Sequence, residues 1–161
     1  MSWLLPEATI HVDEASRKDA SDLASIHAQS FTHGWSAEEF ASLLSQSNVI
    51  CLCARRVGVL GAQRTVGFVL VRVAADEAEI LTVAVAPASR GRGTGRRLVE
   101  EAIRRLYRGR IESLFLEVDE NNRPAVSLYR ALGFDQVGQR TGYYREPGGA
   151  ASALVMRLQL R

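Results

Sequence analysis

The stretch from Val83 to Leu98 constrains the fold more than any other part of the chain. Its start overlaps the apolar and partly β-branched run Leu81–Val85, which predicts a buried strand that ends at Pro87. Three glycines within five residues follow, and beyond Gly95 apolar residues recur at helical spacing. The start of a helix presents unpaired N–H groups and a partial positive charge, and both suit an anion. This stretch therefore predicts a phosphate-binding turn.

Arginines surround the turn at four positions: Arg90, Arg92, Arg96 and Arg97. Two common phosphate-binding patterns do not fit. A Walker A loop needs Gly-Lys before Ser or Thr, and the only lysine of the chain is Lys18. A dinucleotide-binding fingerprint needs a third small residue where Arg96 stands. The pattern that fits is Arg-x-x-Gly-x-Gly, from Arg90, Gly93 and Gly95, and a solvated basic turn is the alternative.

Length and composition predict one domain over residues 1–161, with a core from about residue 8 to residue 160. The formal net charge of +2 argues weakly against a general nucleic-acid binder. No apolar run reaches membrane-spanning length, and we expect a cytoplasmic protein. Cys51 and Cys53 lie on one face of an apolar strand, and no second Cys or His pair accompanies them. We therefore expect core cysteines and no metal site.

Periodicity and capping signals predict the element order β-α-α-β-β-β-α-β-α-β-β. Strands are expected at residues 8–12, 49–55, 65–73, 77–85, 113–118, 136–143 and 153–159, and helices after Ser16 or Ser21 and at 37–44, 93–107 and 123–132. Ser36 and Glu39 form a capping box, and Asn121 or Asn122 is expected to cap the last helix. A crossover helix requires parallel strands, whereas the early hairpins are antiparallel. The fold class is therefore α/β, with a mixed seven-stranded sheet and about four helices.

Four motifs downstream stand in register with the Arg90–Gly95 turn: Leu116-Glu117-Val118, Asn122, Ser127-Leu128-Tyr129 and Leu132-Gly133-Phe134. With the turn and the element order, they resemble the GNAT superfamily of N-acetyltransferases. The resemblance covers roughly Ile10 to Leu158 and is most specific from Val83 to Phe134. It implies a single-domain GNAT fold, with acetyl-CoA as the co-substrate and its pyrophosphate in the turn.

Within the superfamily the chain looks most like the bacterial RimI-type enzymes, which acetylate the N-terminal alanine of a small-subunit ribosomal protein. Glu117 and Tyr129 match the catalytic pair of these enzymes. The stretch from residue 31 to residue 36 is similar to their loop between the first two helices. Tyr143 and Tyr144 match a tyrosine pair in their next-to-last strand, and with Trp35 they are expected to line the acceptor groove.

The resemblance assigns roles to individual residues. Glu117 is expected to accept the proton of the amine, and Tyr129 to protonate the departing thiolate. Contacts with acetyl-CoA are expected from Val83, Ala84, Val85, Arg90, Gly91, Arg92, Gly93, Thr94, Gly95, Arg96 and Asn122. Plainer alternatives exist for these residues: a strand-end salt bridge for Glu117, a core aromatic for Tyr129, a helix cap for Asn122, and solvated side chains for the arginines.

The acceptor is expected to be a protein N-terminus, such as that of a ribosomal protein, or a small amine (an amino acid, polyamine or aminoglycoside). RimI-type enzymes tend to carry an acidic residue just before the last strand, where this chain has Ala151 and Ser152, so the acceptor stays open. We expect no membrane or direct nucleic-acid partner, and a monomer or a weak homodimer. The alternative from another class is a non-catalytic module that binds CoA or nucleic acid through the arginine-rich helix, and Glu117 with Tyr129 argues against a module that binds only CoA.

Overall fold

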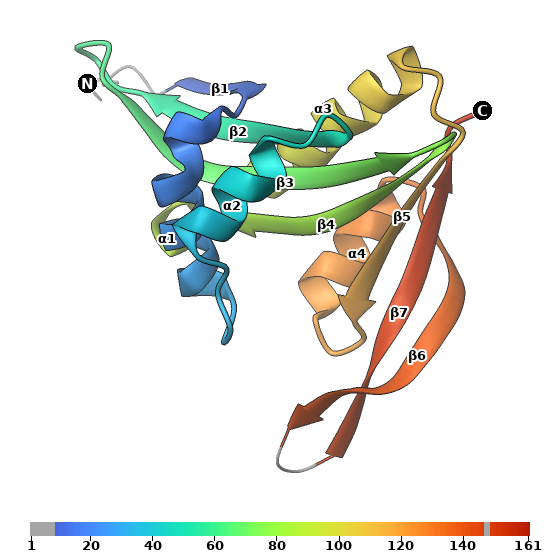
Figure 1. Cartoon of the computed structure of the whole chain (residues 1–161). Coiled ribbons are helices and arrows are strands. Elements are labelled where there is room, and N and C mark those ends of the chain that lie inside the picture. The colour runs from blue at the N-terminus through green and yellow to red at the C-terminus, as the bar shows by residue number, and fades with distance from the viewer. Residues whose placement is uncertain (1–8, 147–148) are drawn as a thin grey trace, which may run out of the picture. The chain divides into compact units, whose positions relative to one another are not determined.

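The structure is a computed structural model that describes residues 9–146 and 149–161, and the side chains of residues 142–151 lie outside the described part. Figure 1 shows the elements in the predicted order. The strands are β1 (Thr9–Glu14), β2 (Val49–Val57), β3 (Gln63–Ala74), β4 (Glu77–Val85), β5 (Ser113–Asp119), β6 (Asp135–Glu146) and β7 (Gly149–Gln159). The helices are α1 (Ala20–Ser30), α2 (Ala37–Leu44), α3 (Thr94–Arg108) and α4 (Arg123–Ala131), with short 3-10 helices η1 (Arg17–Asp19) and η2 (Pro87–Ser89). The predicted α/β class is confirmed.

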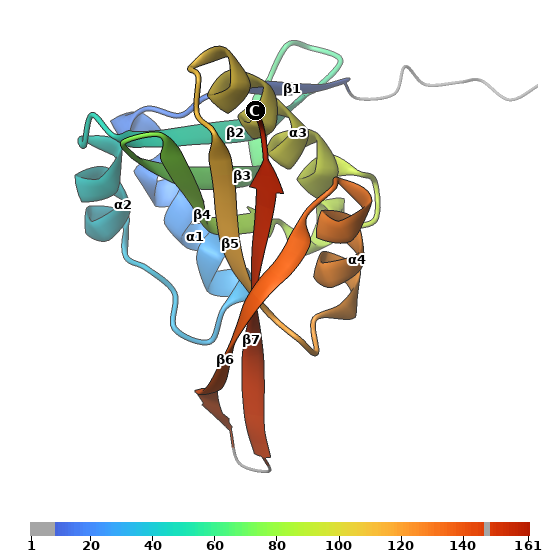
Figure 2. The same ribbon diagram turned by 90° about the vertical axis from the view of Figure 1, so that its right-hand side faces the viewer.

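The seven strands form one mixed sheet in the order β1-β2-β3-β4-β5-β7-β6. The ladder between β4 and β5 is parallel and runs from Glu77↔Ser113 to Ile80↔Leu116, as the crossover through α3 requires. The pairs β1–β2, β5–β7 and β6–β7 are antiparallel. Figure 2 shows the β6–β7 hairpin running past the end of β5.

The described residues group into two compact units. The first unit holds the residues up to Val71 together with Thr82–Ala102, and the second holds Arg72–Leu81 and Ile103–Arg161. In the first unit α1 and α2 pack on each other, and the rings of Phe40 and Phe68 meet edge to face with centroids 5.4 Å apart. The largest fully buried side chains of the second unit are Leu106, Leu114, Phe134 and Met156. Each unit thus has a core of its own.

The structure confirms the predicted cap of α2. The capping box at the start of α2 is present, because Glu39 N–H donates to Ser36 Oγ (3.1 Å) and Ser36 N–H donates to Glu39 Oε2 (2.9 Å). The start of the first helix differs from the prediction. Asp19 is the N-cap of α1, whereas Ser16 precedes η1 and Ser21 lies inside α1. The extra 3-10 turn forms because Ser16 N–H donates to the Asp19 carboxylate (2.8 Å).

The helical spacing of Leu23, Ala24, Ile26, His27 and Phe31 predicts a shared buried face on α1. Leu23, Ile26 and His27 are buried, whereas Phe31 is 43% exposed. Phe31 is the C-cap residue, with an extended backbone (φ −131°, ψ 142°), so it lies at the exposed end of the helix although its ring still stacks on that of His27 (centroids 4.3 Å apart).

Candidate active site

The glycine-rich turn has the backbone that an anion site requires. Gly91 and Gly93 adopt left-handed conformations (φ +76° and +77°), which cost residues with a Cβ about 1–2 kcal/mol. The first helical hydrogen bond of α3 runs from Arg97 N–H to the Gly93 carbonyl (3.1 Å). The amides of Thr94 to Arg96 therefore precede the first bond of the helix, and within the described residues we find no partner for them. These N–H groups give the turn a local positive field.

The arginine side chains of the turn make different contacts within the protein. Arg90 is tied to the protein: its Nε donates to the Val85 carbonyl and one Nη donates to Ser30 Oγ, both at 3.0 Å. Arg96 pairs with Glu100 at 2.7 Å, one helical turn away on the surface of α3. Arg92 is exposed. The guanidinium of Arg90 thus braces the turn against α1, and cofactor contacts of all three side chains stay predictions.

The end of β4 directs two backbone amides away from β3. N–H groups along a strand point alternately to its two sides. Because Ala86 N–H donates to a β3 carbonyl (2.7 Å), Ala84 N–H faces β3, and the N–H groups of Val83 and Val85 face the other edge. The Val85 carbonyl, which points to the same side as its N–H, is the group that Arg90 binds. Of the three β4 residues predicted to contact acetyl-CoA, Val83 and Val85 therefore present N–H groups on that edge, whereas Ala84 does not.

Glu117 lies on β5 and forms an ion pair, the alternative named for it, with a partner that the sequence did not indicate. Arg140 on β6 places an Nη 2.9 Å from Glu117 Oε1, across the intervening strand β7. The Glu117 side chain is 25% exposed and that of Arg140 is 57% exposed. A carboxylate is a group that can accept a proton. The Glu117 carboxylate is thus held by Arg140 and stays partly exposed to solvent.

Tyr129 is buried on α4, with 8% of its surface exposed. Its ring meets Phe134 edge to face, with centroids 5.6 Å apart. Burial raises the pKa of Tyr129 to about 12, because the phenolate is poorly solvated there. The phenol is therefore fully protonated near neutral pH and can act only as a hydrogen donor to an anion.

Asn122 is the cap that the sequence predicted. Its Oδ1 accepts from Ala125 N–H at the start of α4 (3.4 Å). Its own N–H donates to the Asp119 carbonyl at the end of β5 (2.9 Å), which fixes the turn between strand and helix. The long Oδ1 contact leaves a second lone pair and the side-chain NH₂ group for a ligand.

The structure describes only some of the residues predicted on the acceptor side. Trp35 lies directly before the N-cap Ser36, and its ring is 5.6 Å from that of Phe40. This is the arrangement of a hydrophobic staple, which by itself explains an aromatic residue at this position. The side chains of Tyr143 and Tyr144 lie outside the described residues. Ala151 and Ser152 lie within β7; Ser152 is buried (5% exposed), and the side chain of Ala151 lies outside the described residues.

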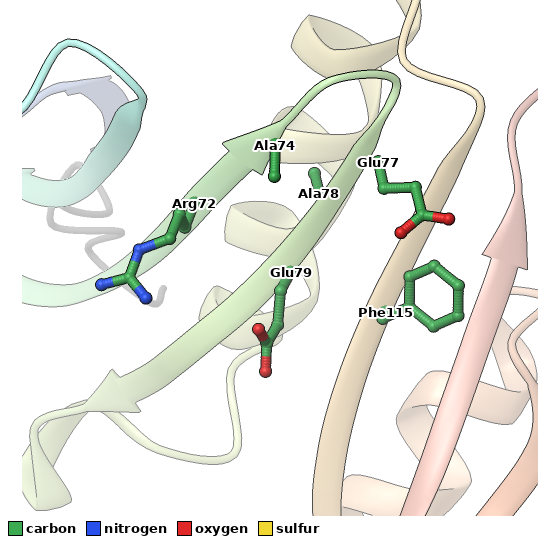
Figure 3. A pocket seen from close by; sticks show the side chains of 6 residues that line it. All are labelled: Arg72, Ala74, Glu77, Ala78, Glu79 and Phe115. Carbon is green, nitrogen blue, oxygen red and sulfur yellow. The ribbon is translucent and has the colours of Figure 1, made fainter.

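A separate cavity of about 260 Å³ lies on strands of the second unit and contains none of the predicted site residues. Figure 3 shows its lining: Arg72, Ala74, Glu77, Ala78, Glu79 and Phe115. Glu79 pairs in register with Phe115, and Glu77 lies near the same ring in Figure 3. Its excess of carboxylates does not suit the phosphates of CoA.

Residues 9–146 and 149–161 contain no cluster of three or more His, Cys, Asp or Glu that could hold a metal ion. Cys51 and Cys53 are buried as predicted, and a hydrogen bond to Cys53 together with burial raises the pKa of the Cys51 thiol. None of the helices described is long and apolar enough to cross a membrane.

Known proteins resemble this chain along most of its length. A model of the acetyltransferase (GNAT) family matches residues 20–134. An N-alpha-acetyltransferase RimI of Mycobacterium tuberculosis is 36% identical, with 92% of this chain and 91% of that protein aligned. The [ribosomal protein bS18]-alanine N-acetyltransferase of Escherichia coli K12 is 31% identical (90% and 96% aligned), and a crystal structure of the E. coli enzyme matches with a TM-score of 0.85 at 27% identity, covering 94% of each chain. An uncharacterised protein of Mycobacterium leprae is 37% identical over 86% of this chain, which spans only 38% of that protein.

Proposed function

The chain belongs to the acetyltransferase (GNAT) family and is an acetyl-CoA-dependent N-acetyltransferase, and from this premise we propose that its acceptor is the N-terminal α-amine of a protein. The observation that carries the proposal is the alignment of at least 90% of the chain with two N-terminal acetyltransferases at 31–36% identity. An alanine N-terminus, as in the ribosomal substrate named for the E. coli relative, is the first acceptor to test.

On the donor side, we assign the pyrophosphate of acetyl-CoA to the amides of the turn from Gly91 to Arg96. The left-handed glycines and the free amides at the start of α3 support this assignment. The N–H groups of Val83 and Val85 are the candidate donors to pantetheine and to the thioester oxygen, because they face the edge of β4 away from β3. Asn122 can add a side-chain contact from the end of α4 that lies nearest β5.

On the acceptor side, the Glu117 carboxylate removes a proton from the ammonium group of the acceptor. The neutral amine then attacks the thioester carbonyl carbon, and the nitrogen of the tetrahedral adduct loses its second proton to solvent. The adduct collapses to the amide as the C–S bond breaks and releases the CoA thiolate. Tyr129 donates a hydrogen bond to that thiolate. A thiol has a pKa of about 8.5, below that of Tyr129 at about 12, so complete proton transfer from the phenol is unfavourable. The role of Tyr129 in this proposal is therefore to stabilise the leaving sulfur by hydrogen bonding.

The acceptor class is tested by thiol release with a peptide that begins with alanine and is free of lysine. Matched acceptors are the same peptide with a blocked N-terminus, a polyamine and an aminoglycoside. We expect kcat/KM for the free peptide to exceed that for each small amine by about 10-fold or more, the discrimination expected when a peptide fills a specific site. A higher value for a small amine would replace the proposal by the small-molecule alternative.

The assignment of the turn is tested by Gly93→Ala. The alanine Cβ meets no atom within 4 Å, so the backbone conformation alone is disturbed, at a cost of about 1–2 kcal/mol. We expect the Kd for acetyl-CoA to rise about 10-fold, because the backbone N–H groups of the turn no longer point toward the phosphates. Gly61→Ala is the matched control: Gly61 has φ +81°, also meets no atom within 4 Å, and lies in the β2–β3 connection. It should lose similar stability and keep its affinity, and equal losses of affinity in both variants would contradict the assignment.

A further inference from the structure

His27 is a buried histidine that the acetyl-transfer mechanism does not use. It lies on α1 with 3% of its surface exposed. Its Nδ1 accepts a hydrogen bond from the backbone N–H of Trp35, at 3.0 Å. A ring nitrogen that accepts carries no proton, so the imidazole is uncharged and its proton is on Nε2. The connection between α1 and α2 is thus fastened to α1 by one imidazole nitrogen.

Aromatic rings enclose the same imidazole. Phe31 stacks on one side, with centroids 4.3 Å apart, and Trp35 also stacks on it at 4.8 Å. Phe40 of α2 meets the ring edge-on at 5.5 Å, and Phe68 of β3 is 6.4 Å away. Phe31 and Trp35 stand near the two ends of the connection, so the imidazole holds both ends through stacking and the Trp35 end through its hydrogen bond as well.

The connection begins beside the end of β4. Arg90 donates both to Ser30, the last residue of α1, and to the Val85 carbonyl. These three residues and the connection belong to the same unit, so their contacts fix where residues 31–36 start relative to the turn and to β4. Residues 31–34 are exposed to solvent. They form a surface that starts at Ser30, which Arg90 links to the Val85 carbonyl at the end of β4.

We propose that His27 is a positioning residue for the acceptor: its uncharged imidazole holds the connection 31–36 beside the end of β4 through the Trp35 N–H bond, and protonation of the ring releases the connection and weakens acceptor binding. The proposal rests on the proposed function for the identity of the acceptor. The fastening of the connection itself rests only on the contacts of the first unit.

The protonated ring would place an N–H against the N–H of Trp35, so the hydrogen bond is lost on protonation. Burial lowers the pKa of His27 below its ordinary value of 6.5, and the carboxylate of Glu39 on α2 partly opposes this shift. The other groups packed on the ring are uncharged aromatics of the connection, α2 and β3. The stabilising contribution of the neutral ring is complete above pH 6.5 and is lost as the pH falls through the lowered pKa.

Two substitutions separate the functions of the ring. His27→Asn keeps an acceptor oxygen near the position of Nδ1 and does not titrate, whereas His27→Phe keeps the stacking and removes the acceptor. His33→Asn is the matched control, because His33 is an exposed histidine of the same connection. All variants carry Trp3→Phe, so that Trp35 is the only tryptophan. The measurements are Trp35 emission and the kcat and KM of acetyl transfer between pH 5 and pH 8.

In the parent protein and in His33→Asn, we expect Trp35 emission to titrate below pH 6.5 and the acceptor KM to rise about 10-fold over the same range, with kcat changed less than twofold. His27→Asn should show neither pH effect, and His27→Phe should have the raised KM at every pH. The proposal would be overturned if Trp35 emission and the acceptor KM titrated in His27→Asn as they do in the parent protein. It would also be overturned if the acceptor KM of the parent stayed constant over the pH range in which Trp35 emission changes. If the parent protein acetylates no amine, the proposed function fails, and the emission data alone decide whether His27 fastens the connection.

Discussion

Replacement of Glu117 by glutamine is expected to lower kcat by about 100-fold or more, while the Kd for acetyl-CoA changes less than about twofold. The amide keeps the size and the hydrogen-bond acceptor of the carboxylate but cannot take a proton. The loss should therefore appear in the chemical step and not in donor binding. Thiol-release kinetics with a peptide acceptor, together with calorimetric titration of acetyl-CoA, measure the two quantities separately.

The ion pair with Arg140 offers a second variant at the same place. Arg140→Gln removes the cation that lies 2.9 Å from Glu117 Oε1 while leaving the proposed base intact. We expect a smaller reduction of kcat, about 10-fold, because the carboxylate loses a partner that holds it in one orientation. Glu112→Gln, at an exposed position just before β5, is the control and should be unchanged. Wild-type turnover of Glu117→Gln across the pH range would remove Glu117 from the mechanism.

Local features of the fold could be predicted because short stretches of sequence determine them. The Ser36–Glu39 box involves residues three apart, and Asn122 caps the helix that it begins. The turn after β4 depends on Gly91 and Gly93, whose left-handed backbone is inexpensive only for glycine. In each case the physical cause lies within a few residues of its effect.

Contacts between distant residues were not predictable from a single sequence. The bond from Arg90 to Ser30 joins residues 60 positions apart, so a guanidinium expected on a phosphate is engaged with α1. The pair formed by Arg140 and Glu117 spans β7 and depends on the register of β6, which shifts between Arg140 and Tyr144. A one-residue change of register would put a side chain on the other face of the sheet. The residue types thus indicated which charged groups are present at these positions, and the tertiary contacts decided which of those groups are already engaged within the protein.

The surroundings of His27 also could not be predicted from the sequence alone. The sequence shows no partner for this histidine at a recognisable spacing. Burial between two aromatic rings and the bond from Trp35 N–H exist only once the connection after α1 folds back on the helix. The long-range packing of α1, α2 and β3 creates this environment.

Tyr129→Phe is expected to lower kcat by about 10- to 100-fold with little change in the KM of either substrate, because the lost hydrogen bond forms mainly to the thiolate that develops in the reaction. The phenylalanine ring can keep the edge-to-face contact with Phe134, so the fold should persist. Val126→Ala, one turn earlier on α4 and also buried, is the control for a purely structural effect. It should lower stability and leave kcat within about twofold.

The pH dependence of stability provides an independent test of the burial of the Tyr129 hydroxyl. Its pKa is raised from 10.0 to about 12, so the stability contributed by the neutral phenol is complete below pH 10 and declines as the pH rises through about 12. Urea unfolding of the wild type should therefore lose stability above pH 10, and Tyr129→Phe should lose less. If turnover falls in Tyr129→Phe while the alkaline loss is unchanged, the hydroxyl acts from a solvated position, and the buried donor described here is wrong. If turnover stays at the wild-type level, thiolate stabilisation must come from another group, and the N–H groups of Val83 and Val85 become the first candidates.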